Sequence, residues 1–166
     1  MPVSPVSSRG AFTPSSLKYV VLSDQKASGT DGGGFNSGDW RTRTLNTEDY
    51  DGGGICTLAA NQFTLEAGNY LIEAYAPAYF VNFHQARLYN VTGTASLVLG
   101  TSNLEPTSLG NGPTTYSIVI GAFTVAAAQA LEIQHQCSTT RAGNGFGNAS
   151  SFGVEVYTKV LIWQAG

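Results

Sequence analysis

Charged side chains are scarce in this sequence. Asp, Glu, Lys and Arg together make up 11% of the 166 residues, whereas soluble proteins usually contain about 25%. The basic residues are scattered and form no stripe or cluster, so the sequence does not predict nucleic-acid binding. A surface with so little charge must be covered by hydroxyl, amide and backbone groups, or by other subunits.

Cysteines and long apolar runs are also few. Cys56 and Cys137 are too few for a disulfide framework. We expect two free, mostly buried thiols, since a single bridge would require the two strands to lie side by side. No run approaches the length of a membrane span, and the N-terminal residues lack the apolar stretch of a secretory signal. The sequence therefore predicts no membrane insertion.

Segments with the pattern of a long helix are missing between Leu65 and Trp163. Short runs in which apolar and polar residues alternate take their place, and this period of two is typical of β-strands. We expect strands at residues 19–22, 40–45, 55–58, 62–65, 70–76, 79–90, 96–101, 116–125, 131–137 and 154–163. A chain of such runs predicts an all-β sandwich or barrel.

Proline and glycine mark the segments between these strands. Residues 1–17, rich in Pro and Ser, are expected to form an extended arm or linker, and residues 18–166 a single domain. The glycine-rich segments 23–39 and 48–54 are expected to be surface loops. Pro77 is expected to end the strand that begins at Tyr70, because proline cannot donate a backbone hydrogen bond.

Two of the expected strands are apolar on both faces. In 116–125, Ile118 and Ile120 oppose Val119 and Phe123, and strand 154–163 has the same character. A sandwich strand needs only one apolar face, so the second must be covered by a loop of the same chain or by another subunit. Because uncovered apolar area of this size promotes aggregation, we favour an oligomer. The expected interface residues are Tyr79, Val81, Phe83, Ile118, Ile120, Tyr157, Leu161 and Trp163.

Residues with catalytic or metal-binding chemistry form no recognisable motif. His135 and Cys137 face the same way on one expected strand, and a zinc site would need His84 or Cys56 nearby, but packed side chains are the favoured interpretation. Glu48, Asp49 and Asp51 cluster in a glycine-rich segment, where acidic residues are usually solvated. The sequence therefore predicts no cofactor, no metal and no enzymatic activity, although a carboxylate pair for glycoside hydrolysis would leave no fixed spacing.

Aromatic residues in the polar loops are the candidates for ligand binding. Loops on a rigid sandwich are the usual place for recognition, and aromatic rings there can stack on sugars. The candidates are Phe35, Trp40, Tyr50 and Phe146. Each ring can equally well pin its own loop to the sheet, so both interpretations stay open.

Three longer segments resemble a known family. FTLEAGNYLIEA, AQALEIQHQC and FGVEVYTKVLIW are similar to the central, penultimate and closing strands of C1q/TNF-like jelly rolls. With HQARLYNVT and NGFGNASS, the chain from about Lys18 to Trp163 resembles domains at the ends of tail-fibre and other virion-appendage proteins of tailed bacteriophages. The resemblance implies a homotrimer of ten-stranded jelly rolls, assembled in the bacterial host cytoplasm, where the cysteines would stay reduced.

The function implied by the resemblance is that of a non-enzymatic virion component. It would attach the particle to the host surface, binding a glycan or an outer-membrane protein, and its N-terminal arm would dock on other virion proteins. One alternative is a capsid or collar decoration protein that binds no receptor. A polysaccharide depolymerase is the third possibility.

Overall fold

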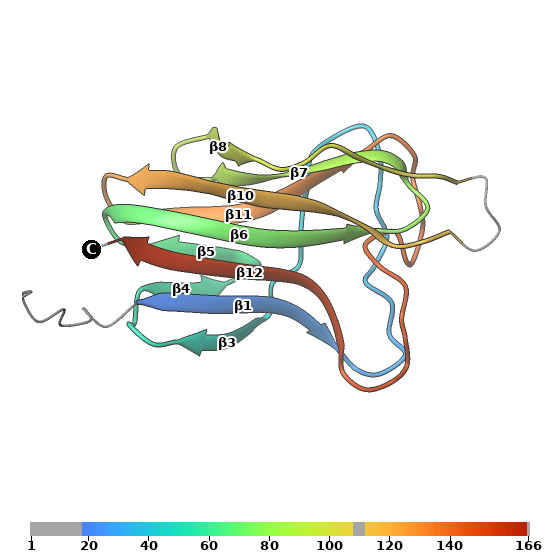
Figure 1. Cartoon of the computed structure of the whole chain (residues 1–166), viewed down its shortest axis with the longest axis horizontal. Helices are drawn as coiled ribbons and strands as arrows, with labels where there is room; N and C mark the ends of the chain where they lie inside the picture. The colour runs from blue at the N-terminus through green and yellow to red at the C-terminus, as the bar shows by residue number, and fades with distance from the viewer. Residues whose placement is uncertain (1–17, 108–111, 166) are drawn as a thin grey trace, which may run out of the picture.

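The computed structural model describes residues 18–107 and 112–165, which form a sandwich of two antiparallel sheets (Figure 1). These residues contain twelve β-strands and no helix, so the prediction of an all-β sandwich is confirmed. In the described part of the chain, no helix is long and apolar enough to span a membrane. The predicted arm, residues 1–17, lies outside the described residues.

The first sheet has five strands in the order β10-β6-β12-β1-β3. Its strands are β1 (Tyr19–Lys26), β3 (Thr47–Asp51), β6 (Gly68–Ala78), β10 (Thr115–Val125) and β12 (Glu155–Ala165). All four pairings are antiparallel, and β6 pairs with β10 along its whole length. The two strands predicted to be apolar on both faces, β10 and β12, therefore flank β6 in the same sheet.

The second sheet has seven strands, five of which follow the order β4-β5-β11-β7-β8. The short strands β2 and β9 pair with β11 and β7, respectively. The strand bounds are β2 (Arg41–Thr42), β4 (Cys56–Ala59), β5 (Gln62–Leu65), β7 (Asn82–Asn90), β8 (Ala95–Leu99), β9 (Asn103–Glu105) and β11 (Gln129–Cys137). The central strand, β11, contacts β5, β7 and β2.

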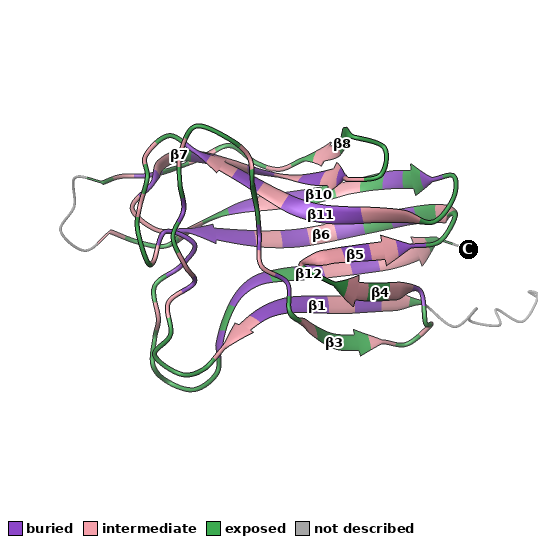
Figure 2. Ribbon diagram, turned by 180° about the vertical axis from the view of Figure 1, so that it is seen from behind, coloured by how far each residue is buried: buried purple, intermediate pink, exposed green. Residues whose placement is uncertain are grey.

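The main core lies between the two sheets and follows the period of two. On β6 the inward side chains are Tyr70, Ile72, Ala74 and Ala76, and all are buried. On β7 the inward residue Leu88 is buried and its neighbours Arg87 and Tyr89 point outward. Figure 2 shows this alternation as purple bands separated by pink and green along the strands. Apolar burial between the sheets is the main driving force for this fold.

A second, smaller core closes the loop end of the sandwich, and it is built from Phe35, Ala78, Val81, Cys137 and Phe146. The Gly-rich segment before Phe35 runs beside the segment around Phe146, with a hydrogen bond from Gly32 N to Gly147 O at 2.9 Å. A Cβ on Gly32 would lie 2.8 Å from the carbonyl carbon of Phe146, so this close approach requires glycine. The expected surface loop is thus partly a core element.

Arg43 is fully buried beside this second core and links three segments that lie far apart in the sequence. Its guanidinium donates to Thr158 Oγ1 at 2.7 Å, to Pro77 O at 3.1 Å and to Phe146 O at 3.1 Å. Burial lowers the pKa of Arg43 to about 9, partly offset by the charge of Asp24. A guanidinium can satisfy several carbonyls at once, so Arg43 replaces the missing backbone pairing in the loops.

Three expectations about the strands were wrong. Residues 48–51, expected to belong to a loop, form most of β3 on the edge of the five-stranded sheet, because pairing with β1 satisfies their backbone. The expected strand 40–45 is reduced to β2, since the chain turns inward to bury Arg43 and Leu45. Pro77 does not end β6, which stays paired with β10 as far as Ala78. On its other side, β12 pairs with β6 only as far as Tyr75, so residue 77 needs no backbone amide to donate there.

Candidate functional site

The outer face of the five-stranded sheet is apolar and exposed, and we call it the apolar face. Its outward side chains are Tyr19, Val21, Tyr50, Leu71, Glu73, Tyr75, Ile118, Ile120, Lys159, Leu161 and Trp163. Ile120 is 64% exposed and Leu71 is 51% exposed. Single exposed apolar residues are common in proteins, but clusters of them such as this one are not. In Figure 1 this sheet faces the viewer, and no described segment crosses the middle of β6, β12 and β1.

The strand register aligns these side chains in rows across the sheet. One row contains Ile120, Glu73, Leu161, Val21 and Tyr50, contributed by β10, β6, β12, β1 and β3 in that order. Cross-strand neighbours in such a row are close enough to act as one continuous surface. The result is a mostly apolar surface that crosses the whole sheet and is interrupted by Glu73.

Two charged residues lie within the apolar face. The hydroxyl of Tyr75 donates a hydrogen bond to Glu73 Oε1, and this bond to the carboxylate raises the pKa of Tyr75. Lys159 forms an ion pair with Asp49 at 3.9 Å. The two charges have opposite sign and each has a partner in the same chain, so neither prevents the face from packing against a protein surface.

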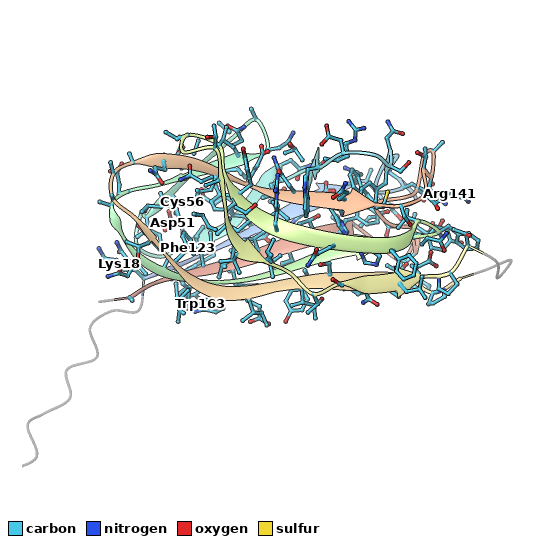
Figure 3. The ribbon with its side chains drawn as sticks, turned by 90° about the horizontal axis from the view of Figure 1, so that it is seen from above. Lys18, Asp51, Cys56, Phe123, Arg141 and Trp163 are labelled. Carbon is cyan, nitrogen blue, oxygen red and sulfur yellow. The ribbon has the colours of Figure 1, made fainter. Side chains whose placement is uncertain are left out.

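Ile118, Ile120, Leu161 and Trp163 of the predicted interface all lie on the apolar face, and Figure 3 shows Trp163 at the end of the sandwich opposite Arg141. Neighbours that the sequence interpretation left out include Leu71 and Tyr75. They could have been found from the sequence, because they oppose the core residues Tyr70, Ile72 and Ala74 on the same strand.

Four other predicted interface residues lie elsewhere. Val81 is completely buried in the second core, because Phe80 and Asn82 adopt positive φ values of 56° and 60° and break the strand alternation. Tyr157 is buried, because one residue of β1 opposes two of β12 between the pairs Ser23–Lys159 and Gln25–Val156. Placing these two in an interface was therefore wrong. The remaining two, Tyr79 at the loop end and Phe83 on the other sheet, are not on the apolar face.

The outer face of the seven-stranded sheet is mainly polar, and we call it the polar face. Its outward side chains include Thr42, Gln62, Thr64, Gln85, Arg87, Tyr89, Ser96, Glu132, Gln134 and Gln136, together with the exposed apolar residues Phe83, Leu99 and Leu104. Arg87 donates to Gln134 Oε1 and to Ser96 Oγ, and its Cζ lies 4.0 Å from the ring centre of Trp40. Glu132 accepts hydrogen bonds from Thr42 and Gln62. This hydrogen-bond network of polar side chains is typical of a sheet face that contacts solvent or a ligand.

The four aromatic residues predicted to bind a ligand do not form one site. Phe35 and Phe146 are buried in the second core with their ring centres 4.5 Å apart, because the loops that carry them fold inward; proposing them as ligand contacts was wrong. Trp40 lies on the polar face against Arg87. Tyr50 lies on the apolar face, where it stacks on Tyr19 at 4.5 Å. Trp40 and Tyr50 therefore face opposite sides of the sandwich.

The two histidines meet in the interior beneath β7 and β11. His84 Nδ1 and His135 Nε2 are 2.9 Å apart, and His84 Nε2 is 2.8 Å from Thr115 Oγ1. Burial, helped by the charge of Arg43, lowers the pKa of His84 to about 4 and lowers the pKa of His135 well below its ordinary value. Both rings are therefore neutral at pH 7, and one must donate to the other.

Both cysteines are free thiols, as expected. Cys137 is buried, and Cys56 is half-buried near Asp51 at the opposite end of the sandwich (Figure 3). Burial raises the pKa of Cys56 to about 12 and that of Cys137 to about 11. In residues 18–107 and 112–165, no three His, Cys, Asp or Glu side chains are placed to hold a metal ion.

Asp49 and Asp51, two of the clustered acidic residues, make structural hydrogen bonds. Asp51 accepts from the backbone amides of Gly53, Ile55 and Cys56, which fixes the turn after β3. Asp49 accepts from Gln25 Nε2 at 2.6 Å. A glycosidase needs two carboxyl groups that flank a substrate cleft, and these carboxylates instead stabilise the edge of the five-stranded sheet.

Comparison with solved structures identifies the fold. The chain matches murine APRIL at pH 5.0 with a TM-score of 0.59 and 10% identity, and at pH 8.0 with a TM-score of 0.56 and 10% identity. Both matches cover 90% of this chain and 99% of the other. The globular domain of zebrafish complement 1qA protein matches with a TM-score of 0.53 and 11% identity over 90% of this chain and 98% of that domain.

These likenesses confirm a C1q/TNF-like jelly roll, since APRIL belongs to the TNF family. At such low identity they establish the fold alone. No protein-family model matches the sequence, and no curated protein matches it.

Proposed function

We propose that this chain is a non-enzymatic, homotrimeric appendage module of a tailed-phage virion that attaches the particle to the host surface. The observation that carries the proposal is the apolar face, which crosses five strands and leaves Ile120 64% exposed. Burying such a face between copies gains roughly 25 cal/mol per Å² of apolar surface. Self-association is therefore the arrangement that this surface favours.

A closed trimer needs two different patches on each chain, because a threefold interface is heterologous. The apolar face supplies one patch. The second patch must come from another exposed surface of the chain. The C1q/TNF-like fold and the resemblance to phage appendage domains support the same assembly.

The proposal of a non-enzymatic role is supported by the structural hydrogen bonds that several carboxylates make. The carboxylates of Asp51, Glu132 and Glu155 all accept hydrogen bonds from their own chain. A binding role needs only accessible surface, and the polar face offers it. Attachment through the polar face would leave the apolar face free for assembly.

Two measurements test this proposal in sequence. Size-exclusion chromatography with light scattering on the full chain is expected to give three times the mass of one chain, and a stable monomer at micromolar concentration would refute the assembly. Labelled trimer is then expected to bind cells of a susceptible strain among a panel of bacteria. An intact trimer that binds no strain would point to a decoration protein, and release of reducing sugar ends from cell polysaccharide to a depolymerase.

A further inference from the structure

An open groove of about 570 Å³ lies on the outer side of the seven-stranded sheet. Its floor is formed by outward side chains of β7 and β11, and its walls by the segment before β9 and by the loop around Ser37. The groove belongs to the sheet opposite the apolar face. A trimer that buries the apolar face can therefore leave this groove accessible.

The floor of the groove contains an exposed aromatic ring. Phe83 is 66% exposed, and its partner across the β7·β9 pair is Leu104. The apolar surface of an exposed phenyl ring is in contact with water, which is unfavourable. A bound partner that covers the ring would bury this surface and gain free energy. Ligand sites usually combine such an apolar surface with a few convergent polar groups.

Polar groups surround the ring and some have free hydrogen-bonding capacity. The Gln136 amide and the Ser102 hydroxyl make no hydrogen bond to any other residue that the structure describes. Gln85 lies beside Gln136 in the register and donates from Nε2 to Gly100 O at 2.8 Å, which fixes its Oε1 as an acceptor. Amides and hydroxyls both donate and accept, so together they match the alternating donors and acceptors of a polyhydroxy ligand.

Both walls of the groove are held in place by hydrogen bonds within the chain. Asn103 donates from Nδ2 to Tyr116 O at 2.9 Å and accepts at Oδ1 from Leu104 N at 2.8 Å. Ser37 bonds to Thr140 through both its amide and its hydroxyl. A site whose walls are already ordered loses little conformational entropy when a ligand binds.

The lining of the groove carries no charged side chain, which favours a neutral ligand. It contains no Asp, Glu, Lys or Arg. His84 beneath the floor is neutral at pH 7, since its pKa is about 4. The nearby guanidinium of Arg41 is bonded to the carbonyls of Asn36 and Ser37, on the loop that forms the rim. An acidic sugar or a phosphate would therefore find no opposite charge inside the groove.

We propose that this groove binds a neutral saccharide, with a C–H face of one sugar ring on Phe83 and its hydroxyls on Gln85, Ser102 and Gln136. This inference rests on the proposed attachment function and gives the chemical class of its ligand. Trp40 lies on the same polar face, stacked on Arg87, where it extends the surface beside the groove.

The test is ligand-observed NMR on the full-length chain with maltotriose, cellotriose, mannotriose, chitotriose and a rhamnose trisaccharide, each at about 10 mM. At least one neutral sugar is expected to show saturation transfer, strongest at the C–H protons of one ring. F83A and Q136A are expected to weaken binding by about tenfold or more. The matched control is F152A, because Phe152 is 97% exposed but lies in the loop before β12, outside the groove.

Several outcomes would overturn the inference. These are the absence of transfer to all five sugars, equal binding by F83A and wild type, and stronger binding of an acidic trisaccharide. Light scattering on the same samples separates this failure from failure of the assembly: a trimeric wild type that binds no sugar overturns the groove alone. Loss of the trimer in F83A would instead assign Phe83 to the interface and overturn the proposed site.

Discussion

The two outer faces of the sandwich differ in chemistry although both sheets have the same strand periodicity. On the five-stranded sheet, the outward row from Ile120 to Tyr50 is mostly apolar. On the seven-stranded sheet, Arg87, Gln134 and Glu132 are linked by hydrogen bonds. Since the fold needs only the inward residues, the outward ones are free to specify function: protein contact on one face and solvent or ligand contact on the other.

The comparison predicts that one new charge has opposite consequences on the two faces. Ile120→Lys is expected to weaken the trimer by about 3 kcal/mol or more, roughly a hundredfold or more in the dissociation constant, because an ammonium would be buried at the interface. Thr64→Lys, the matched change on the polar face, is expected to leave the mass by light scattering unchanged. An Ile120→Lys protein that stays trimeric would remove the apolar face from the interface.

A second prediction separates the two sheets by their response to acid. His84 and His135, beneath the seven-stranded sheet, have folded pKa values below the unfolded value near 6.5. The unfolded chain therefore binds protons first, and stability falls as the pH drops from 6.5 towards 4. Denaturant unfolding is expected to lose about 2 kcal/mol or more between pH 7 and pH 4.5.

His84→Gln keeps a polar side chain at this position but does not titrate. It is expected to flatten the pH dependence of the free energy of unfolding between pH 6.5 and 4.5, whatever its effect on stability at pH 7. An unchanged slope would show that His84 is not one of the groups responsible.

A third prediction concerns the polar face itself. Arg87→Ala is expected to lower the free energy of unfolding by about 1 kcal/mol, because the change removes the bonds to Gln134 and Ser96 and the contact with Trp40. Arg87→Lys keeps the positive charge but lacks the planar guanidinium with its several N–H donors, so it should recover only part of the lost free energy of unfolding. Thermal unfolding measures the loss, and a change in oligomeric state would contradict the assignment of Arg87 to a solvent-facing surface.

The smallest expected effect lies at the start of β12 in the five-stranded sheet. The Glu155 carboxylate accepts from the amides of Gly29, Ser150 and Ser151, and these bonds lower its pKa to about 2. Because the folded pKa is depressed, this contribution is present above the unfolded value of 4.5 and is lost as the pH falls towards 2. This pH range lies below the one in which the histidines titrate. Lowering the pH should therefore weaken the seven-stranded sheet first and the start of β12 afterwards.

Glu155→Gln is expected to speed amide hydrogen exchange at Gly29, Ser150 and Ser151 with little change in global stability, since an amide oxygen accepts fewer bonds than a carboxylate. Exchange at the β6 amides serves as the internal control. Unchanged exchange at all three amides would mean that other contacts hold this loop.

Parts of the candidate site followed directly from the sequence. The alternation in β10 put Ile118 and Ile120 on the face opposite Val119 and Phe123, and the structure shows that the first pair points outward and the second pair inward. Prediction failed where alternation breaks: Val81 turns inward between two residues of positive φ, and Tyr157 turns inward at a bulge. A bulge depends on the partner strand, so a single sequence carries no local signal for it.

The sequence by itself determined the all-β class and which residues of the regular strands share a face, because the alternation of side chains is a local property of an extended backbone. Only the tertiary structure decided which distant groups meet. The contact of His84 with His135, the burial of Arg43 against Pro77 and Phe146, and the separation of Trp40 from Tyr50 onto opposite faces all depend on strand order. Strand order is a long-range property, set by how the two sheets cover one another's apolar surface.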